Sequence, residues 1–341
     1  MEWTSSSVVT STSGRRDRDA PGAHGRRECG PAAAVTMQLA QTVFGVEFQN
    51  PVLLASGTCG YGAELDGLLD LDALGGLVIK AVTADVRRGN AAPRVAEFSA
   101  GMMNSVGLAN PGPAVVRDEK LPWLARRLQR ARVLVNIAGR TAEEYGEIIR
   151  GLDDSAGFHA YELNVSCPNV KEGGAIIATR EDLLAAAVGA ARRATKRPIS
   201  VKLAPNVPDI GRMAQICVAE GADALTLVNT MPGLLFDPET RRPVLGAGSG
   251  GVSGPALLPI GIHAVSCARE RVSVPIIGVG GIQSAADAVQ YLLAGASLVQ
   301  IGTASFADPR AAERVLSGLK GWGAAHDIGT VTELVGSGLL A

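Results

Sequence analysis

Aromatic side chains and net charge are both scarce in this chain of 341 residues. Phenylalanine, tryptophan and tyrosine make up 4% of the sequence, and the formal net charge is −1. Few aromatic residues argue against a surface on which nucleobases stack, and a near-neutral chain has no general electrostatic attraction for nucleic acid. No apolar run approaches the length of a transmembrane helix. We therefore expect neither a nucleic-acid partner nor a membrane anchor.

Cysteine and histidine are also sparse, which narrows the possible chemistry. The five cysteines, at positions 29, 59, 167, 217 and 267, are odd in number and form neither a CxxC pair nor a zinc pattern. A reduced, cytoplasmic location is the simpler interpretation. The four histidines join no cluster with acidic residues, so we expect no metal site. A Rossmann-type NAD site is not indicated, because no GxGxxG stands between a strand and a helix.

The first 36 residues differ from the rest of the chain. They are rich in Ser, Arg, Gly and Ala and show no hydrophobic period. A transit peptide is one interpretation, but Asp17, Asp19 and Glu28 dilute the basic character that such peptides need. A disordered tail fits this composition better, unless Met37 is the true initiator. We predict an N-terminal extension, residues 1–36, followed by one folded domain, residues 37–341.

Beyond Met37 the chain alternates short apolar runs with helical patterns. Hydrophobic residues make up 47% of the sequence, enough for a large core. Each run is aliphatic and largely free of alternation, as expected for parallel strands buried on both faces. Eight such strands with intervening helices favour an α/β fold of the (β/α)8 TIM-barrel type, with a doubly wound open sheet as the alternative. The eight runs are Val52–Ala55, Leu77–Ala81, Val133–Ile137, Ala160–Asn164, Ile199–Leu203, Ala224–Val228, Ile276–Val279 and Leu298–Ile301.

Helix signals and two long connections complete this pattern. The connections Thr83–Arg132 and Asn229–Pro255 are too long for simple turns, so we expect insertions at the C-terminal face of the strands that shape or cover the site. The predicted helices are Arg180–Thr195, Pro208–Glu220 with Gly221 as its stop, a helix from the cap Ser284 to Ala294, and a helix from the cap Asp308 through Pro309 to about Lys320.

Polar residues and glycines follow the predicted strands at their C-terminal ends, where a barrel places its active site. A single asparagine there is usually a turn residue, but several at strand ends favour a shared ligand. Amides both donate and accept, so they suit a ring that bears carbonyl and N–H groups. In chain order these residues are Ser56, Lys80, Asn136, Asn164, Lys202, Asn229, Thr230, Gly280, Gly281, Gly302 and Thr303, with Asn104 added by the first insertion.

Lys80 and Lys202 each close a buried apolar run. A lysine near a strand end is usually a solvated surface charge, but an unpaired ammonium in so apolar a place would be costly. Two lysines at one barrel mouth therefore favour an anionic ligand. The glycine pairs after the last two strands match the usual phosphate site of barrels, where backbone N–H groups and a helix N-terminus hold a phosphate. The segment 250–255 adds another glycine-rich entry to a helix.

The hexapeptide Asn164-Val165-Ser166-Cys167-Pro168-Asn169 places a thiol among polar side chains, just after a strand. A free cysteine is most often a buried structural residue, but Pro168 and the polar neighbours favour a loop at the site. A nucleophilic role would need a positioned histidine, and His159 precedes the strand, which puts it at the opposite face. A cysteine general base fits better, because its ordinary pKa of about 8.5 needs only modest help near neutral pH.

Four segments together resemble the dihydroorotate dehydrogenase family. The likeness runs from about Met37 to about Lys320, and the Asn-Ser-x-Gly-Leu and Asn-x-Ser-Cys-Pro-Asn motifs are highly specific in combination. Class 2 members, which are membrane-associated and quinone-linked, carry serine where this chain has Cys167, so the resemblance points to class 1. The four segments are Lys80-Ala81-Val82-Thr83, Asn104 to Gly112, Glu162 to Asn169, and Val279-Gly280-Gly281-Ile282.

Within class 1, three further segments look like the B type. That type is similar to a catalytic subunit paired with an electron-transfer subunit that carries FAD and a 2Fe–2S cluster and passes electrons to NAD. This chain has no cysteine cluster for iron–sulfur ligation, so the resemblance implies that FAD, the cluster and the NAD site lie on the partner. Cys59 stands where the family more often has an aromatic residue. The three segments are Ala55 to Gly62, Asn229 to Gly233, and Gly250 to Ala256.

The resemblance implies that (S)-dihydroorotate is oxidised to orotate in pyrimidine biosynthesis, with FMN as the hydride acceptor. Cys167 would remove the C5 proton while C6 gives hydride to flavin N5. Lys202 would stabilise negative charge on the reduced flavin. The implied substrate ligands are Lys80, Asn104, Ser105, Val106, Gly107, Leu108, Asn164, Asn229 and Thr230. The implied FMN ligands are Ser56, Lys80, Ala81, Asn136, Asn164, Lys202, Val228, Gly254, Gly280, Gly281, Gly302 and Thr303.

The resemblance further implies a homodimeric core that binds two copies of the partner as a cytoplasmic heterotetramer. Three alternatives stay open at this point. The first is a class 1A-like homodimer that reduces fumarate, and the second is a relative of dihydropyrimidine dehydrogenase that acts on uracil or thymine. The third is a barrel that binds a phosphorylated ligand without catalysis, which would be colourless where an FMN protein is yellow.

Overall fold

The computed structural model describes residues 36–166 and 174–339. They belong to the second of two compact units of the chain, Val35–Ala341. The predicted extension, residues 1–36, lies almost entirely outside the described residues, and so does the predicted base Cys167. The domain boundary at residue 37 therefore stays a prediction.

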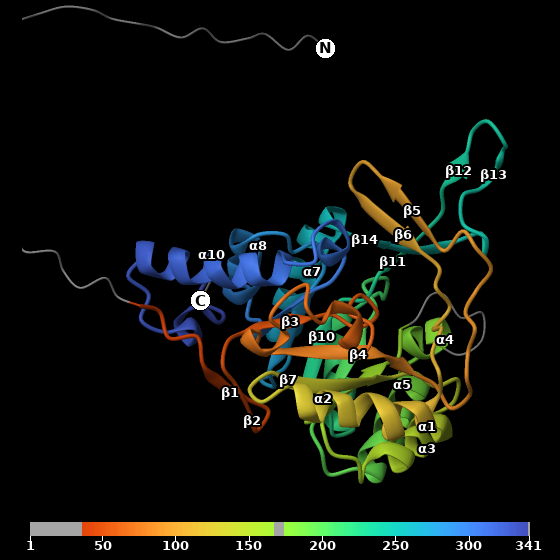
Figure 1. Cartoon of the computed structure of the whole chain (residues 1–341), viewed down its shortest axis with the longest axis horizontal. Coiled ribbons are helices and arrows are strands. Elements are labelled where there is room, and N and C mark those ends of the chain that lie inside the picture. Colours follow the sequence, from red (N-terminus) through yellow and green to blue (C-terminus); the bar gives the residue numbers. More distant parts are fainter. Residues whose placement is uncertain (1–35, 167–173, 340–341) are drawn as a thin grey trace, which may run out of the picture. The chain divides into compact units, whose positions relative to one another are not determined.

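Eight parallel strands form a closed barrel (Figure 1). They are β3 (Val52–Leu54), β4 (Gly76–Val82), β7 (Arg132–Ile137), β8 (Ala160–Asn164), β9 (Ile199–Leu203), β10 (Ala224–Leu227), β15 (Ile276–Val279) and β16 (Leu298–Ile301). Each pairs with the next in the chain, and β16 closes the ring against β3. The predicted (β/α)8 barrel is confirmed, because an open doubly wound sheet would leave two unpaired edges.

Helices join most successive barrel strands, whereas β3 and β4 are joined by two short 3₁₀ helices. No helix in the described ranges is both long and apolar enough to cross a lipid bilayer. The α-helices are α1 (Pro113–Val115), α2 (Leu121–Arg127), α3 (Ala142–Leu152), α4 (Gly174–Thr179), α5 (Glu181–Ala194), α6 (Ile210–Ala219), α7 (Leu258–Arg269), α8 (Ala285–Leu293), α9 (Ala304–Ala307) and α10 (Ala311–Ala325). The remaining helical turns are η1 (Ala63–Leu65), η2 (Leu71–Ala73), the π-helical η3 (Val116–Lys120), η4 (Pro255–Leu257) and η5 (Val331–Leu334).

Local capping explains where several of these helices begin. Ser284 caps α8 through a capping box with Asp287, as the sequence predicts. The predicted start of the last long helix, with Asp308 as its cap, was wrong. Asp308 ends α9, and its carboxylate accepts a hydrogen bond from the N–H of Arg310 at 2.8 Å. Because this turn satisfies Asp308 before the helix begins, α10 starts at Ala311 and continues past Lys320.

The barrel interior is apolar at one end and polar in the middle. The short strands β1 (Gln41–Val43) and β2 (Val46–Phe48) pair as a hairpin that buries Val43 and Phe48 at the N-terminal end of the barrel. Inward-facing residues of the strands pack on this plug and keep water out. They are Leu53, Val78, Leu134, Ala160, Ile277 and Leu298. Moving toward the C-terminal end, the next inward positions include the fully buried Asn136, Glu162 and Gln300.

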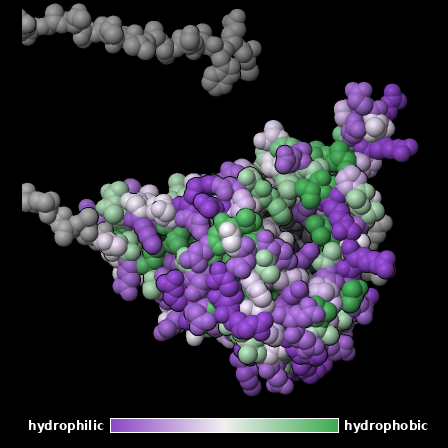
Figure 2. Space-filling view, in the orientation of Figure 1, coloured by the Kyte–Doolittle hydropathy of each residue, from purple (hydrophilic) through white to green (hydrophobic). Residues whose placement is uncertain are grey.

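The two predicted insertions meet above the barrel as one small antiparallel sheet. Its order is β11 (Met231–Gly233), β14 (Gly250–Ser253), β6 (Gly101–Asn104) and β5 (Val95–Phe98). Gly251 pairs with Asn104, which joins segments almost 150 residues apart. A second hairpin, β12 (Phe236–Asp237) with β13 (Arg242–Pro243), extends beside it (Figure 1). Hydrophobic surface gathers around β11 and β14 on the face shown in Figure 2.

Candidate active site

A large pocket opens at the C-terminal ends of the barrel strands, under the sheet formed by the insertions. Its empty space is about 1270 Å³, counting the part that opens to solvent. The cavity proper, without this open space, is about 200 Å³. Its position agrees with the rule that barrel active sites lie at the C-terminal face.

All of the site residues predicted from the sequence line this pocket, with three exceptions. Ser105 is fully buried and does not line it, and Asn136 lies beneath its floor. The third, Cys167, lies outside the described residues. The lining includes Ser56, Lys80, Ala81, Asn104, Val106, Gly107, Leu108, Asn164, Lys202, Val228, Asn229, Thr230, Gly254, Gly280, Gly281, Gly302 and Thr303.

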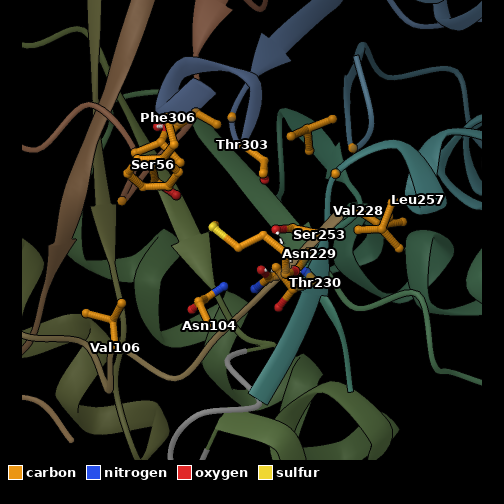
Figure 3. A pocket seen from close by; sticks show the side chains of 18 of the residues that line it. Ser56, Asn104, Val106, Val228, Asn229, Thr230, Ser253, Leu257, Thr303 and Phe306 are labelled. Atoms are coloured by element: carbon orange, nitrogen blue, oxygen red, sulfur yellow. Dashed lines mark hydrogen bonds between the residues drawn. The ribbon is translucent and has the colours of Figure 1, made fainter. Parts of the chain in front are cut away.

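Asn229 organises the amide-rich end of the pocket. Its Nδ2 donates to Asn164 Oδ1 at 3.1 Å and to Ser166 Oγ at 2.9 Å, while its own Oδ1 accepts from the N–H of Thr230 at 2.9 Å. Ser166 Oγ in turn donates to the carbonyl of Lys202 at 2.9 Å. Figure 3 shows Asn104 near Asn229 and Thr230 in this part of the pocket. The strand ends of β8, β9 and β10 are thereby fixed to one another.

The pocket wall presents cationic side chains. Within the described ranges, its lining carries two ammonium groups, Lys80 and Lys202, and no carboxylate. Lys80 has no carboxylate within ion-pair distance among those residues. An unpaired ammonium in a half-buried wall is expensive unless a ligand supplies the counter-charge. The wall therefore suits an anionic ligand.

A buried polar network lies under the pocket floor. Glu162 of β8 accepts hydrogen bonds from Asn136 Nδ2 at 2.6 Å and from Gln300 Nε2 at 2.8 Å. Lys202 Nζ lies 3.8 Å from Glu162 Oε1 and donates to Ser56 Oγ at 3.4 Å. The sequence reasoning missed Glu162 and Gln300 as members of the site. The available signal was a charged residue inside the otherwise apolar run 160–164.

The glycine-rich end of the pocket is a tight backbone cradle. Gly280 and Gly281 have φ angles of 127° and 76°, which L side chains rarely adopt. A Cβ on Gly281 would lie 2.5 Å from the backbone nitrogen of Leu258 at the start of α7. The loop can therefore approach this helix only without a side chain.

Ser56, Thr303 and Phe306 lie together at another part of the wall (Figure 3).

The loop 105–108 is pinned by the rest of the first insertion. The N–H of Ser105 donates to the carbonyl of Arg94 at 2.8 Å, and Arg87 Nε donates to the carbonyl of Gly107 at 3.3 Å. Leu108 has a φ of 56°, a left-handed conformation that is strained for a leucine. Val106, Gly107 and Leu108 of this loop line the pocket, as Asn164 does.

The comparison with known families agrees with this geometry. The model of the family described as dihydroorotate dehydrogenase matches residues 38–322. The chain belongs to the dihydroorotate dehydrogenase family. The match covers the whole barrel except the end of α10 and the residues that follow it.

Three curated relatives of the dihydroorotate dehydrogenase family illustrate the likeness. A Geotalea daltonii protein named dihydroorotate dehydrogenase B (NAD(+)), catalytic subunit, is 44% identical over 299 residues, which is 88% of this chain and 97% of the relative. A Pelobacter propionicus protein of the same name is 45% identical over 293 residues, 86% of this chain and 96% of the relative. A Solibacter usitatus protein with the provisional name dihydroorotate dehydrogenase A (fumarate) is 48% identical over 303 residues, 89% and 99% of the two chains.

Cys59, the departure from the dihydroorotate dehydrogenase pattern, lies behind the pocket wall. It is fully buried, and its thiol donates to the carbonyl of Val78 at 3.1 Å. Burial, reinforced by the negative charge of Glu64, raises the pKa of the Cys59 thiol to about 12. This thiol stays protonated near neutral pH, so it is not a base for the reaction of this enzyme.

Several apolar pocket residues of this family member were not predicted from the sequence. Met102 and Val95 come from β6 and β5 of the first insertion, and Leu257 comes from η4, just after the second insertion. Phe306 lies in the short helix α9 and is 58% exposed at the rim. Because these side chains carry no polar signal, only the tertiary pairing of the insertions reveals them. The other unpredicted lining residues are Ala55, Gly57, Thr58, Ser253, Val279, Ile282, Gln283 and Ala304.

Proposed function

We propose that this chain is the catalytic subunit of a class 1, B-type enzyme that oxidises (S)-dihydroorotate to orotate in pyrimidine biosynthesis, with FMN as its resident cofactor. The observation that carries the proposal is a large pocket with two lysines, clustered amides and a glycine cradle at the C-terminal face of the barrel. Membership in the dihydroorotate dehydrogenase family supports the same reaction.

The residues present fit FMN. The cradle at Gly280 and Gly281 offers backbone where only glycine fits, as phosphate loops require. The wall offers hydroxyl, ammonium and amide groups suited to a polar ring system, and Asn136 Oδ1 beneath the floor has no hydrogen-bond partner in the described part of the chain. The residues that would hold FMN are Ser56, Lys80, Ala81, Asn136, Asn164, Lys202, Val228, Gly254, Gly280, Gly281, Gly302 and Thr303.

The remaining pocket residues would orient the substrate. Asn104, Asn164, Asn229 and Thr230 would bind the carbonyl and N–H groups of the pyrimidine ring, and Lys80 would neutralise its carboxylate. The loop 105–108 would cover the ring and exclude water from the reacting atoms. When bound, FMN supplies the acceptor for the hydride that leaves C6.

Cys167 would act as the general base at C5. Its thiolate takes the C5 proton, and loss of hydride from C6 then leaves the C5=C6 double bond of orotate. This assignment rests on the hexapeptide motif and the family resemblance, since Cys167 lies outside the described residues. The neutral, buried Cys59 offers no alternative base at this wall.

The test compares Cys167→Ala with Cys267→Ala, a cysteine on the outer helix α7. Both purified proteins should be yellow with bound FMN. Stopped-flow mixing with dihydroorotate should bleach the flavin in Cys267→Ala at the wild-type rate and in Cys167→Ala about 10²–10⁴-fold more slowly, the usual effect of losing a general base. Equal bleaching rates in the two variants would refute the assignment of the base.

The B-type assignment concerns the path of electrons after the flavin. We propose that a partner subunit with FAD and a 2Fe–2S cluster takes them to NAD, and that a homodimer of this chain binds two such partners in the cytoplasm. The names of the Geotalea and Pelobacter relatives support this choice. Co-expression with a candidate partner should yield dihydroorotate-dependent reduction of NAD, and the chain alone should not catalyse it.

A fumarate-reducing enzyme is the second candidate, because the Solibacter relative at 48% identity carries that name. The purified chain, without any partner, is mixed with dihydroorotate and fumarate under anaerobic conditions. Rapid formation of orotate and succinate would favour this candidate. Flavin bleaching without turnover of fumarate would favour the B type.

A further inference from the structure

Glu162 is a buried carboxylate next to the pocket that the proposed reaction does not use. Its side chain is fully buried, and that of Lys202 is 6% exposed. Both carboxylate oxygens of Glu162 accept amide hydrogens, at 2.6 Å from Asn136 and 2.8 Å from Gln300. A buried carboxylate is costly unless it is hydrogen-bonded and paired with opposite charge. Glu162 meets both conditions.

The cation that faces Glu162 belongs to the pocket wall. Lys202 lines the pocket, and its Nζ lies 3.8 Å from Glu162 Oε1 on the neighbouring strand. In a site with little water, the charge of such a pair acts strongly on a nearby ligand. The carboxylate lies below the floor and the ammonium faces the cavity, so Glu162 offsets part of the charge that Lys202 presents to a ligand.

We infer that Glu162 is a charge-balancing and positioning residue that offsets Lys202 and so lowers the reduction potential of the bound flavin. This inference rests on the proposed function, because it takes the occupant of the pocket to be FMN. Reduction adds negative charge to a flavin, which Lys202 favours and Glu162 opposes. Without Glu162, the uncompensated lysine makes the flavin a stronger oxidant.

The structure also indicates that the isosteric variant Glu162→Gln will fold. The new NH₂ group needs an acceptor where the native carboxylate faces only donors. Asn136 Oδ1 and Gln300 Oε1 both lack a hydrogen-bond partner in the described residues. The amide of Gln300 can turn over so that its Oε1 accepts from the new NH₂ group, without moving the backbone.

The experiment measures the midpoint potential of the flavin by reductive titration against reference dyes, in the FMN-loaded full chain. Glu162→Gln should shift the potential to more positive values and Lys202→Met to more negative values. The double variant should return close to the wild type, because both charges are removed together. Thr226→Val is the matched control: it removes the buried hydrogen bond to Ser200 (2.8 Å) inside the same barrel and should leave the potential unchanged.

The outcomes separate this inference from the function on which it rests. An unchanged or more negative potential in Glu162→Gln, with normal FMN loading and a Lys202→Met shift, overturns the inference and leaves the proposed function intact. The inference is also overturned if Thr226→Val shifts the flavin potential as much as Glu162→Gln does. The loss of any buried polar group would then explain the shift. A wild-type protein that binds no FMN overturns both proposals.

Discussion

Replacing Asn229 with alanine tests how the amide-rich end of the pocket works. The substitution removes the donor to Asn164 Oδ1 (3.1 Å) and to Ser166 Oγ (2.9 Å), and the acceptor for the N–H of Thr230. Asn164 is 8% exposed, so its amide oxygen loses its partner in a nearly buried place. Leaving such a group unsatisfied costs about 1–3 kcal/mol. Without Asn229, the strand ends of β8, β9 and β10 can separate, which exposes the unpaired groups to water.

The expected result is weaker binding of the product. If the pocket must be re-ordered around the ligand, a cost of ~1–3 kcal/mol lowers orotate affinity roughly 5- to 150-fold. Asn229→Asp should bind orotate more weakly still, because a carboxylate oxygen would face Asn164 Oδ1 and repel the anionic ligand. The assay is a titration of the flavin absorbance with orotate, which reports the dissociation constant directly.

Asn50 provides a matched control at the opposite end of the barrel. Its amide donates to the carbonyl of Ala73 at 2.9 Å and accepts from the N–H groups of Val52 and Gly75 at 3.1 and 2.9 Å. Asn50 is 4% exposed. Asn50→Ala therefore removes a comparable set of buried hydrogen bonds without changing the pocket. It should lower the free energy of unfolding and leave orotate affinity unchanged. Equal orotate affinities in Asn50→Ala and Asn229→Ala would refute the reasoning.

Two further substitutions test the hydrogen bonds of Asp72 outside the pocket and the glycine cradle at Gly281. Burial alone would raise the pKa of Asp72. The hydrogen bonds from the N–H groups of residues 129–131 and the charge of Arg130 outweigh burial, so the pKa of Asp72 lies below its ordinary value. Asp72→Asn should cost about 1–2 kcal/mol in urea unfolding at neutral pH, and the deficit should disappear as pH falls through the folded pKa. Gly281→Ala should reduce FMN content and the melting temperature, whereas Gly302→Ala, whose Cβ would lie 3.4 Å from Ala55 Cβ, should fold normally.

The barrel strands were predictable because parallel strands buried on both faces are continuous aliphatic runs. Helix ends were predictable where one side chain decides them, as Ser284 does for α8. The start of α10 was not, because Asp308 can cap either a turn or a helix, and the choice depends on α9 before it. For the segment of β14 the sequence predicts only a glycine-rich helix entry, since the pairing of this strand with β6 depends on a distant segment.

The site was predictable as far as polar residues mark strand ends. Lys202 and Asn229 reach the pocket because the barrel brings every strand end to one mouth. Whether an inward-facing residue reaches the cavity depends on its depth along the strand, so Asn136, a predicted FMN ligand, lies beneath the wall. The partnership of Glu162 with Gln300, 138 positions later, is visible only when the ring of strands closes. The residue proposed as the base stays a prediction.

The small sheet above the pocket makes the two insertions a single structural unit. β6 carries Asn104, β11 directly follows Asn229 and Thr230, and β14 is hydrogen-bonded to both strands. A change of length in one insertion shifts the register of the other, and with it the ligands that each delivers to the pocket. Exchange of substrate preference between relatives therefore requires transplanting both segments together, although four of the eight barrel strands lie between them in the chain.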